Sequence, residues 1–145
     1  MKKGTFGIVE GLFYTEKVGK MSNSGKISIK FDDRQDNGVG IGSVAGMVLY
    51  DDFQANTITN SGVLSIDANA TTAEGNPLAG EIVGISGASS QITNEVGGIV
   101  DIVANGSFGI VGIENSAALY SGETLPQIYK IENKGSLRIT ATNTG

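Results

Sequence analysis

The 145-residue chain contains no cysteine and no histidine. The lack of cysteine excludes disulfide bonds and thiolate metal sites. The lack of histidine removes the commonest general base at neutral pH and the commonest zinc ligand, so catalysis would depend on carboxylates alone. We therefore expect no catalytic residue, no cofactor and no metal site.

Proline and basic residues are also scarce. The chain has 2 prolines against 22 glycines, which is typical of a fold with many tight backbone corners rather than of a helical bundle. Its 10 basic residues are scattered and are outnumbered by 15 acidic ones, so the net charge is −5. Because no cationic patch is available to neutralise phosphates, we expect no nucleic-acid partner.

Long hydrophobic runs are missing as well, since none approaches the roughly 20 residues of a membrane-spanning helix. The opening stretch MKKGTFGIVEGLFYTEK has a basic pair, but Gly and Glu interrupt its apolar residues and no A-x-A-like cleavage region follows. A hydrophobic content of 39% is ordinary for a soluble protein, and the length suffices for one domain with a core. We therefore expect one soluble folded unit.

One short sequence motif, here called a phrase, occurs four times in the chain. Each copy has an apolar residue, an Asn, a Gly and then alternating aliphatic residues: MSNSGKISIKF (21–31), ITNSGVLSIDA (58–68), ITNEVGGIVDIVA (92–104) and IENKGSLRITA (131–141). The anchoring glycines are Gly25, Gly62, Gly98 and Gly135, separated by 62 − 25 = 37, 98 − 62 = 36 and 135 − 98 = 37 residues. A period of this size is typical of solenoids.

Each anchor is followed by residues that alternate between apolar and mostly polar, which predicts a half-buried strand. The apolar sets are Ile27, Ile29, Phe31; Leu64, Ile66, Ala68; Val100, Ile102, Ala104; and Leu137, Ile139, Ala141. Val103 is an apolar exception among the residues expected to face outward. The isoleucines four residues after each Gly are predicted to face the core at equivalent positions of successive turns: Ile29, Ile66, Ile102 and Ile139.

Two further phrases complete each unit. The second is GVGIGSVAG from Gly38, GEIVGISGA from Gly80 and SFGIVGIEN from Ser107; the third ends at Tyr14, Tyr50 and Tyr120, and GASSQ replaces it in one unit. Three short strands per repeat predict an all-β fold, a right-handed parallel β-helix with about 36–37 residues per repeat and three short strands per turn. The polar stretches DDRQDN, NATTAEGNP and SGETLPQ are expected to form its corners.

Two sets of side chains recur with the repeat. Asn tolerates left-handed backbone at a corner, and stacked amides hydrogen-bond from turn to turn, so we interpret Asn23, Asn60, Asn94 and Asn133 as structural rather than ligand-binding. We interpret Tyr14, Tyr50 and Tyr120 as a stack or core edge rather than a sugar-binding platform.

The phrases ITNSGVLSIDA and GIVGIENSA resemble the I-x-N-x-G-x-[ILV]-x-[IV] and G-x-G-I phrases of bacterial autotransporter passenger domains. Similar phrases occur in the β-helical part of vacuolating-cytotoxin-like proteins. The resemblance covers nearly the whole chain and implies a type V secreted protein, on the surface of a Gram-negative bacterium or released from it, usually an adhesin or a toxin.

This resemblance implies an organisation and a set of partners. We expect residues 1–145 to be a single β-helical segment, a piece of a longer passenger, at the outer face of the outer membrane or secreted. Expected partners are a host-cell receptor or glycan and the neighbouring β-helix turns of the longer chain. Because a solenoid repeat that breaks off presents unpaired strand edges, we also expect either end-to-end self-association with another copy or fraying around Thr5 to Tyr14 and beyond Leu137. The expected function is structural and adhesive, with the β-helical part of a vacuolating-type toxin as the alternative.

The acidic residues offer an enzymatic and a metal-binding alternative. Parallel β-helices include polysaccharide-cleaving enzymes that use Asp clusters, and the candidates here are Asp32, Asp33, Asp36, Asp51 and Asp52. They lie in turn-like runs without an identifiable Arg or Lys partner, so we expect no enzyme. A calcium loop starting at Asp33 would place Val44 where a bidentate Glu is needed.

A purely structural spacer is the remaining class. It differs from an adhesin only in whether a lateral surface binds a partner, and the inserts NATTAEGNP and SGETLPQ are the expected places for such binding. Neither contains the aromatic and Arg anchors of a hot spot, so the sequence leaves both classes open.

Overall fold

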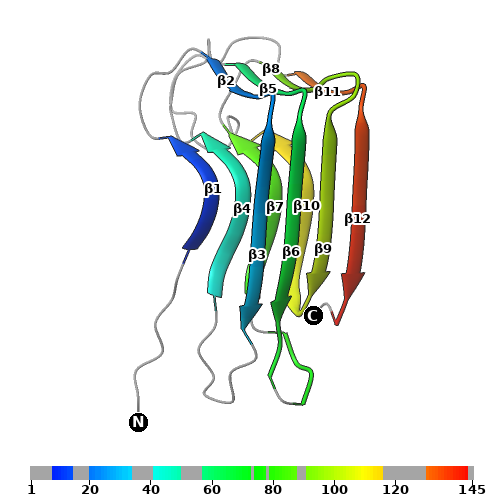
Figure 1. Ribbon diagram of the computed structural model, residues 1–145. Helices are drawn as coiled ribbons and strands as arrows, with labels where there is room; N and C mark the ends of the chain where they lie inside the picture. The colour runs from blue at the N-terminus through cyan, green and yellow to red at the C-terminus, as the bar shows by residue number, and fades with distance from the viewer. Residues whose placement is uncertain are drawn as a thin grey trace.

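The fold is a coil of short strands arranged in three parallel sheets. A computed structural model describes residues 8–14, 20–33, 41–49, 57–72, 74–77, 79–87, 91–115 and 130–143. The back sheet of Figure 1 contains β1 (Ile8–Tyr14), β4 (Ile41–Leu49), β7 (Ala79–Gly87) and β10 (Ser107–Asn115). The top sheet contains β2 (Lys20–Asn23), β5 (Thr57–Asn60), β8 (Gln91–Asn94) and β11 (Lys130–Asn133). The front sheet contains β3 (Lys26–Asp33), β6 (Val63–Ala70), β9 (Ile99–Asn105) and β12 (Ser136–Thr142).

The chain visits the three sheets in a fixed order. In Figure 1 it rises through the back sheet, crosses the top sheet towards the viewer and descends through the front sheet, while it advances from left to right. This path is a right-handed coil. All strand pairs between successive turns are parallel, which confirms the predicted parallel β-helix with three strands per turn.

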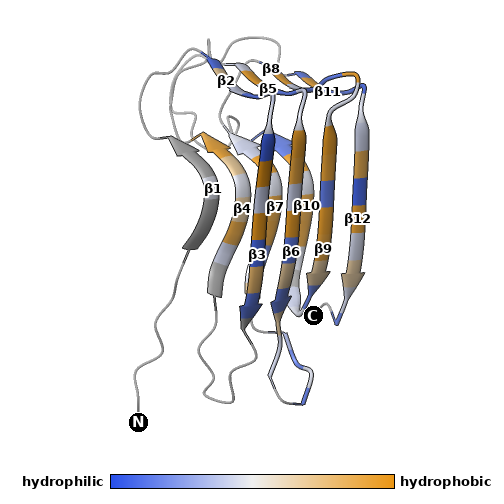
Figure 2. Cartoon of the chain, viewed as in Figure 1, coloured by the Kyte–Doolittle hydropathy of each residue, from blue (hydrophilic) through white to orange (hydrophobic). Residues whose placement is uncertain are grey.

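The register between turns confirms the 36–37-residue repeat. Ile29 pairs with Ile66, Ile66 with Ile102, and Ile102 with Ile139. The first three isoleucines are buried in the core, which fills the space between the sheets. Ile139 keeps the register but is 43% exposed, because no described strand covers the free edge of β12. The alternation of apolar and polar residues along the front-sheet strands is visible as coloured bands in Figure 2.

The division of each turn into strands differs from the prediction. The repeated phrase makes two strands rather than one, because its Asn-to-Gly segment is the corner between the top and front sheets. In β4 the second and third phrases instead lie on one continuous strand, which runs from Ile41 to Leu49. The predicted count of three strands per turn is therefore confirmed, although the three strands do not coincide with the three repeated phrases.

A column of glycines explains why the long strands of the back sheet bend without ending. Gly46 is followed one turn later by Gly84 and then by Gly112. A Cβ on Gly84 would collide with the carbonyl oxygen of Gly112 and with the side chain of Val100 in the front sheet. Glycine is needed here for this close approach of backbone and facing side chains, since the column has no positive φ angle.

One predicted corner insert is described almost completely. Within NATTAEGNP, Asn69 and Ala70 still belong to β6, and a small hairpin closed by an antiparallel bridge between Thr71 and Pro77 projects beyond the coil. In DDRQDN, Asp32 and Asp33 likewise belong to β3, so the strand extends further than predicted. The rest of DDRQDN and all of SGETLPQ lie outside the described residues.

Candidate functional surfaces

The repeated asparagines form a hydrogen-bonded ladder inside the coil. The Nδ2 of Asn23 donates to the Oδ1 of Asn60, Asn60 donates to Asn94, and Asn94 donates to Asn133, each across 2.8 Å. Each donating amide also reaches a backbone carbonyl oxygen in the next turn, namely Val63, Ile99 and Ser136. Because the first three asparagines are buried and these bonds run between turns, the ladder supports the structural interpretation.

A second polar ladder runs along the other end of the front-sheet strands. Asn69 donates to Asp32 across 3.0 Å, and Asn105 donates to Asn69 across 2.8 Å. The last turn closes the column, because Thr142 and Asn143 both donate to the Oδ1 of Asn105. Sequence reasoning missed this ladder, although its members share an offset of 7 residues after each anchoring glycine: Asp32, Asn69, Asn105 and Thr142.

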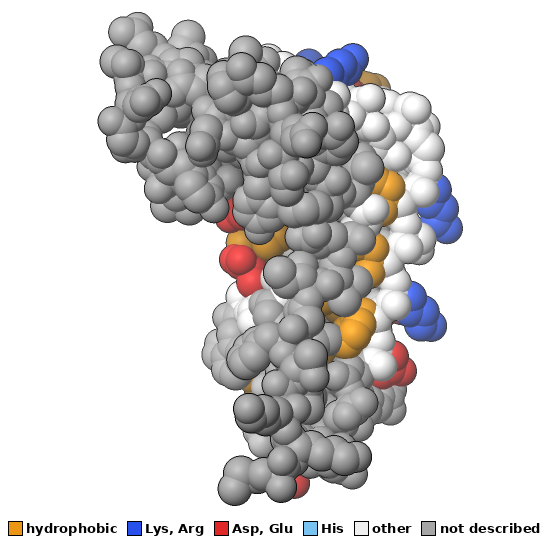
Figure 3. All heavy atoms as spheres, turned by 90° about the vertical axis from the view of Figure 1, so that its left-hand side faces the viewer, with side chains coloured by type: hydrophobic (Ala, Val, Ile, Leu, Met, Phe, Trp, Pro, Cys, Tyr) orange, Lys and Arg blue, Asp and Glu red, His pale blue; other side chains and the backbone are white. Residues whose placement is uncertain are grey.

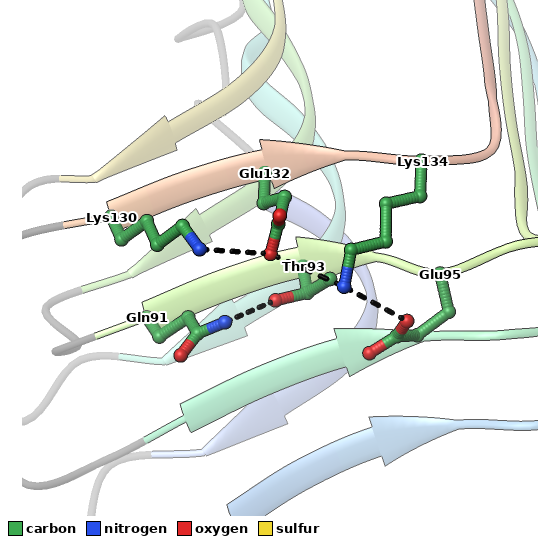
Figure 4. A network of polar contacts seen from close by, with 6 residues as sticks. All are labelled: Gln91, Thr93, Glu95, Lys130, Glu132 and Lys134. Carbon is green, nitrogen blue, oxygen red and sulfur yellow. Dashed lines mark hydrogen bonds and ion pairs between the residues drawn. The ribbon is translucent and has the colours of Figure 1, made fainter.

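Charged residues of the last turn form a network on the outer face of the top sheet, shown in Figure 4. The carboxylate of Glu132 lies 3.2 Å from the ammonium of Lys130 and 3.3 Å from that of Lys134. Lys134 also reaches Glu95 in the preceding turn at 3.8 Å. Hydrogen bonds from Lys130 and Lys134 lower the pKa of Glu132, so this carboxyl stays ionised.

The outer face of the front sheet carries one bidentate ion pair. Arg138 donates from Nε and Nη2 to the two carboxylate oxygens of Asp101, across 2.8 and 2.6 Å. These bonds lower the pKa of Asp101 and raise that of Arg138. The pair links β9 to β12 and holds the guanidinium towards the preceding turn.

Exposed aliphatic residues interrupt the polar outer face of the front sheet at the third turn. Ile99 and Val103 point outward from β9 and are 40% and 41% exposed. Val96 is 79% exposed and lies in a corner with three residues between Asn94 and Gly98, where the other corners have one residue between Asn and Gly. We call Val96, Ile99 and Val103 the third-turn patch. The sequence signal for it was the departure of Val103 from the polar outward pattern.

Of the acidic residues considered for catalysis, only Asp32 has a described side chain. Asp32 lies on β3 and accepts a hydrogen bond from Asn69. The side chain of Asp33 and all of Asp36, Asp51 and Asp52 lie outside the described residues. Among residues that the structure describes, no three acidic side chains lie close enough to hold a metal ion.

Two further sequence candidates cannot be placed. The loop considered for calcium binding, residues 33–44, is described only at its two ends, at Asp33 and from Ile41 onwards. The side chains of the tyrosines lie outside the described residues, although the backbone of Tyr14 ends β1.

In the described ranges, no helix has the length and hydropathy needed to cross a bilayer. No protein-family model, no curated protein and no solved structure matches the chain.

Proposed function

We propose that this chain is a segment of a secreted or surface-displayed bacterial passenger of the autotransporter type, in which the β-helix is a stiff scaffold and its lateral surface mediates attachment. The resemblance of the repeated phrases gives the class of protein. The parallel β-helix is the architecture that this class implies. The attachment itself is assigned to the third-turn patch.

The third-turn patch is the observation that carries the adhesive function. Its three aliphatic side chains are 79%, 40% and 41% exposed, although the outward positions around them are mostly polar. Exposed apolar side chains on a polar face are typical of an interaction surface, and the ion pair of Asp101 with Arg138 lies between Ile99 and Val103. Val96 extends the patch onto a protruding corner, where a partner can reach it without disturbing the coil.

The structural ladders explain how such a patch could be held in place. Asn94 precedes β9 and Asn105 is its last residue, and both are tied by hydrogen bonds to the turns on both sides. Functional side chains on rigid elements lose little conformational freedom when they bind. The patch therefore rests on a strand that pairs with a neighbouring strand on each side.

A binding experiment tests this proposal. The 145-residue chain and the variant Val96→Ser/Ile99→Thr/Val103→Thr are applied to a glycan array and to host cells. We expect binding by the native chain and at least about a tenfold loss in the variant, since each buried aliphatic side chain contributes on the order of 1 kcal/mol or more. The control is Thr57→Ala/Thr59→Ala on the outer face of the top sheet, which should bind normally.

Three other results would point to a different function for the chain: a spacer, a toxin or an enzyme. Binding by neither the native chain nor the control would identify a spacer and contradict the adhesive function. Vacuolation of the treated cells would favour the toxin alternative. Release of reducing or unsaturated sugars from polysaccharides would favour an enzyme.

A further inference from the structure

The corner between β9 and β10 consists of a single residue. β9 ends at Asn105, β10 begins at Ser107, and Gly106 between them has a φ angle of 87°. A Cβ on Gly106 would collide with the carbonyl oxygen of Ala70 in the preceding turn. Both the backbone angle and the close approach therefore require glycine, so the fold places an Asn-Gly dipeptide at this corner.

An Asn-Gly dipeptide can react with itself. The backbone nitrogen of the glycine attacks Cγ of the asparagine, and the new N–Cγ bond closes a succinimide ring. The Cγ–Nδ2 bond breaks, and the leaving group departs as ammonia with the proton from the attacking nitrogen. Water then opens the ring to aspartate or isoaspartate. Glycine favours the attack because it has no Cβ to hinder it, and Asn105 alone precedes a glycine among the asparagines that the structure describes.

In the folded chain each reacting group of this dipeptide is held by a hydrogen bond. The attacking N–H of Gly106 donates to the carbonyl oxygen of Thr142 across 3.1 Å. The Oδ1 of Asn105 accepts from the Thr142 hydroxyl across 3.1 Å and from the Asn143 amide across 2.7 Å. The leaving Nδ2 of Asn105 donates to Asn69 across 2.8 Å. The nitrogen and the carboxamide that must meet are thus held by different partners.

Most of this restraint comes from one place in the coil. Thr142 and Asn143 of the last turn provide three of the four hydrogen bonds. Both residues are exposed. Local opening of a short exposed segment needs less free energy than unfolding of the whole chain. Such an opening frees the Gly106 nitrogen and the Asn105 carboxamide together.

Water, the other reactant, reaches the corner from the outer face of the front sheet. Asn69 and Asn105 are half-buried, and the ladder they belong to begins at the exposed Asp32 and ends at the exposed Thr142. Figure 3 views the coil along its axis from the first turn, with charged side chains projecting along the right-hand margin, where the front sheet lies.

We propose that Asn105 and Gly106 form a self-modification site, at which the chain converts its own asparagine to aspartate or isoaspartate when the contacts from Thr142 and Asn143 open. The chain is the substrate, water is the co-reactant and ammonia is the product released. The folded last turn restrains the reaction. The modified residue is therefore a permanent record of how often this part of the coil has opened.

The reaction weakens the ladder that restrained it. Asp32 only accepts hydrogen bonds, so Asn69 turns its Nδ2 to Asp32 and its Oδ1 to Asn105. The residue at position 105 must then donate to Asn69, and neither product has a side-chain donor when ionised. Two acceptor oxygens would face each other. Isoaspartate would also add a methylene group to the main chain at a corner with room for one residue.

Mass spectrometry of the 145-residue chain, incubated at mildly alkaline pH, tests the proposal. Peptides that contain position 105 are separated into their asparagine, aspartate and isoaspartate forms. In guanidinium chloride, deamidation of Asn105 should be at least about tenfold faster than in the folded chain, since tenfold corresponds to only about 1.4 kcal/mol of opening free energy. The second Asn-Gly dipeptide of the sequence, Asn37 and Gly38, provides a reference rate in the unfolded chain.

Variants of the last turn test the source of the restraint. Thr142→Ala/Asn143→Ala removes both side-chain donors to Asn105 and should speed its deamidation in the folded chain at least about threefold. Thr142→Val keeps the shape of the side chain and should give a smaller change in the same direction. Thr140→Ala is the matched control on the same strand, because Thr140 pairs with Val103, and should leave the rate unchanged. Circular dichroism establishes that the variants remain folded.

The product itself provides a further test. Asn105→Asp introduces the carboxylate directly and should lower the midpoint of denaturant unfolding relative to the native chain. Equal deamidation rates in the folded and the unfolded native chain, or an unchanged rate in both last-turn variants, would overturn the restraint. Absence of aspartate and isoaspartate at position 105 in the unfolded chain would overturn the reactive site. An unchanged midpoint for Asn105→Asp would show that the ladder tolerates the product.

Discussion

Asn60 and Asn94 lie 34 residues apart in the chain and one turn apart in the coil, and the Nδ2 of Asn60 donates to the Oδ1 of Asn94 across 2.8 Å. Both side chains are fully buried. Asn60 therefore has its amide hydrogens directed to the next turn and its oxygen to the preceding one, where Asn23 donates to it. One side chain thus joins three turns.

Asn60→Ala should lower the free energy of unfolding by about 2–4 kcal/mol, because it leaves the Nδ2 of Asn23 and the Oδ1 of Asn94 without one of their partners in the core. Denaturant unfolding followed by circular dichroism measures the loss. Asn133→Ala removes the same group at the exposed end of the ladder and should cost less than about 1 kcal/mol. Equal losses in both variants would contradict the role of burial.

Ile66→Asp should destabilise the fold by several kcal/mol, on the order of 3–5, since it buries an unpaired charge in the aliphatic column. Ile66 is fully buried, whereas Ile139 occupies the same column and is 43% exposed. Ile139→Asp is therefore the matched control, with a much smaller loss. The melting temperature measures both, and an unchanged value for Ile66→Asp would disprove its placement.

Gly84→Ala should cost about 1–3 kcal/mol, because its methyl group would overlap the Gly112 carbonyl oxygen and the Val100 side chain. Gly109→Ala is the control in the same sheet, since the nearest atom to its added Cβ is 3.8 Å away and the substitution should stay within about 0.5 kcal/mol. Chemical unfolding of the two variants provides the comparison. A Gly84→Ala variant as stable as Gly109→Ala would mean that the sheets need not approach so closely.

The Asp101–Arg138 pair predicts a stability difference that depends on pH. The hydrogen bonds from Arg138 lower the pKa of folded Asp101, so the stabilisation is fully present above the unfolded pKa of about 3.9 and is lost as pH falls through the lower folded value. Asp101→Asn should unfold more easily than the native chain at neutral pH, and the two unfolding midpoints should converge in acid. Added salt should narrow the neutral-pH difference, because both groups lie near the surface. If the difference in unfolding midpoint between the native chain and Asp101→Asn instead increased towards low pH, the prediction would be wrong.

The sequence predicted the register because like residues recur at one offset from each glycine, as Ile66 and Ile102 do. It could not divide the strands correctly, since the bend at Gly84 depends on a carbonyl from the next turn and a side chain from the opposite sheet. Such contacts join residues that no local pattern connects. Burial likewise depends on the neighbouring turn. Nothing in the local sequence distinguishes the buried Ile102 from the exposed Ile139. In the third-turn patch, the sequence marked only Val103 as a departure from the polar outward pattern.

The hairpin from Thr71 to Pro77 makes its own hydrogen bonds: the amide of Thr72 donates to the carbonyl of Asn76, and those of Gly75 and Asn76 donate back to Thr72. The chain leaves the coil at Ala70 and has re-entered it by Ala79, and both alanines are fully buried. The number of residues in the hairpin can therefore change without changing the spacing between turns of the coil. The hairpin tip is a permissive position at which a foreign peptide can be grafted and displayed, and at which insertions and deletions can accumulate during evolution without shifting any turn out of register.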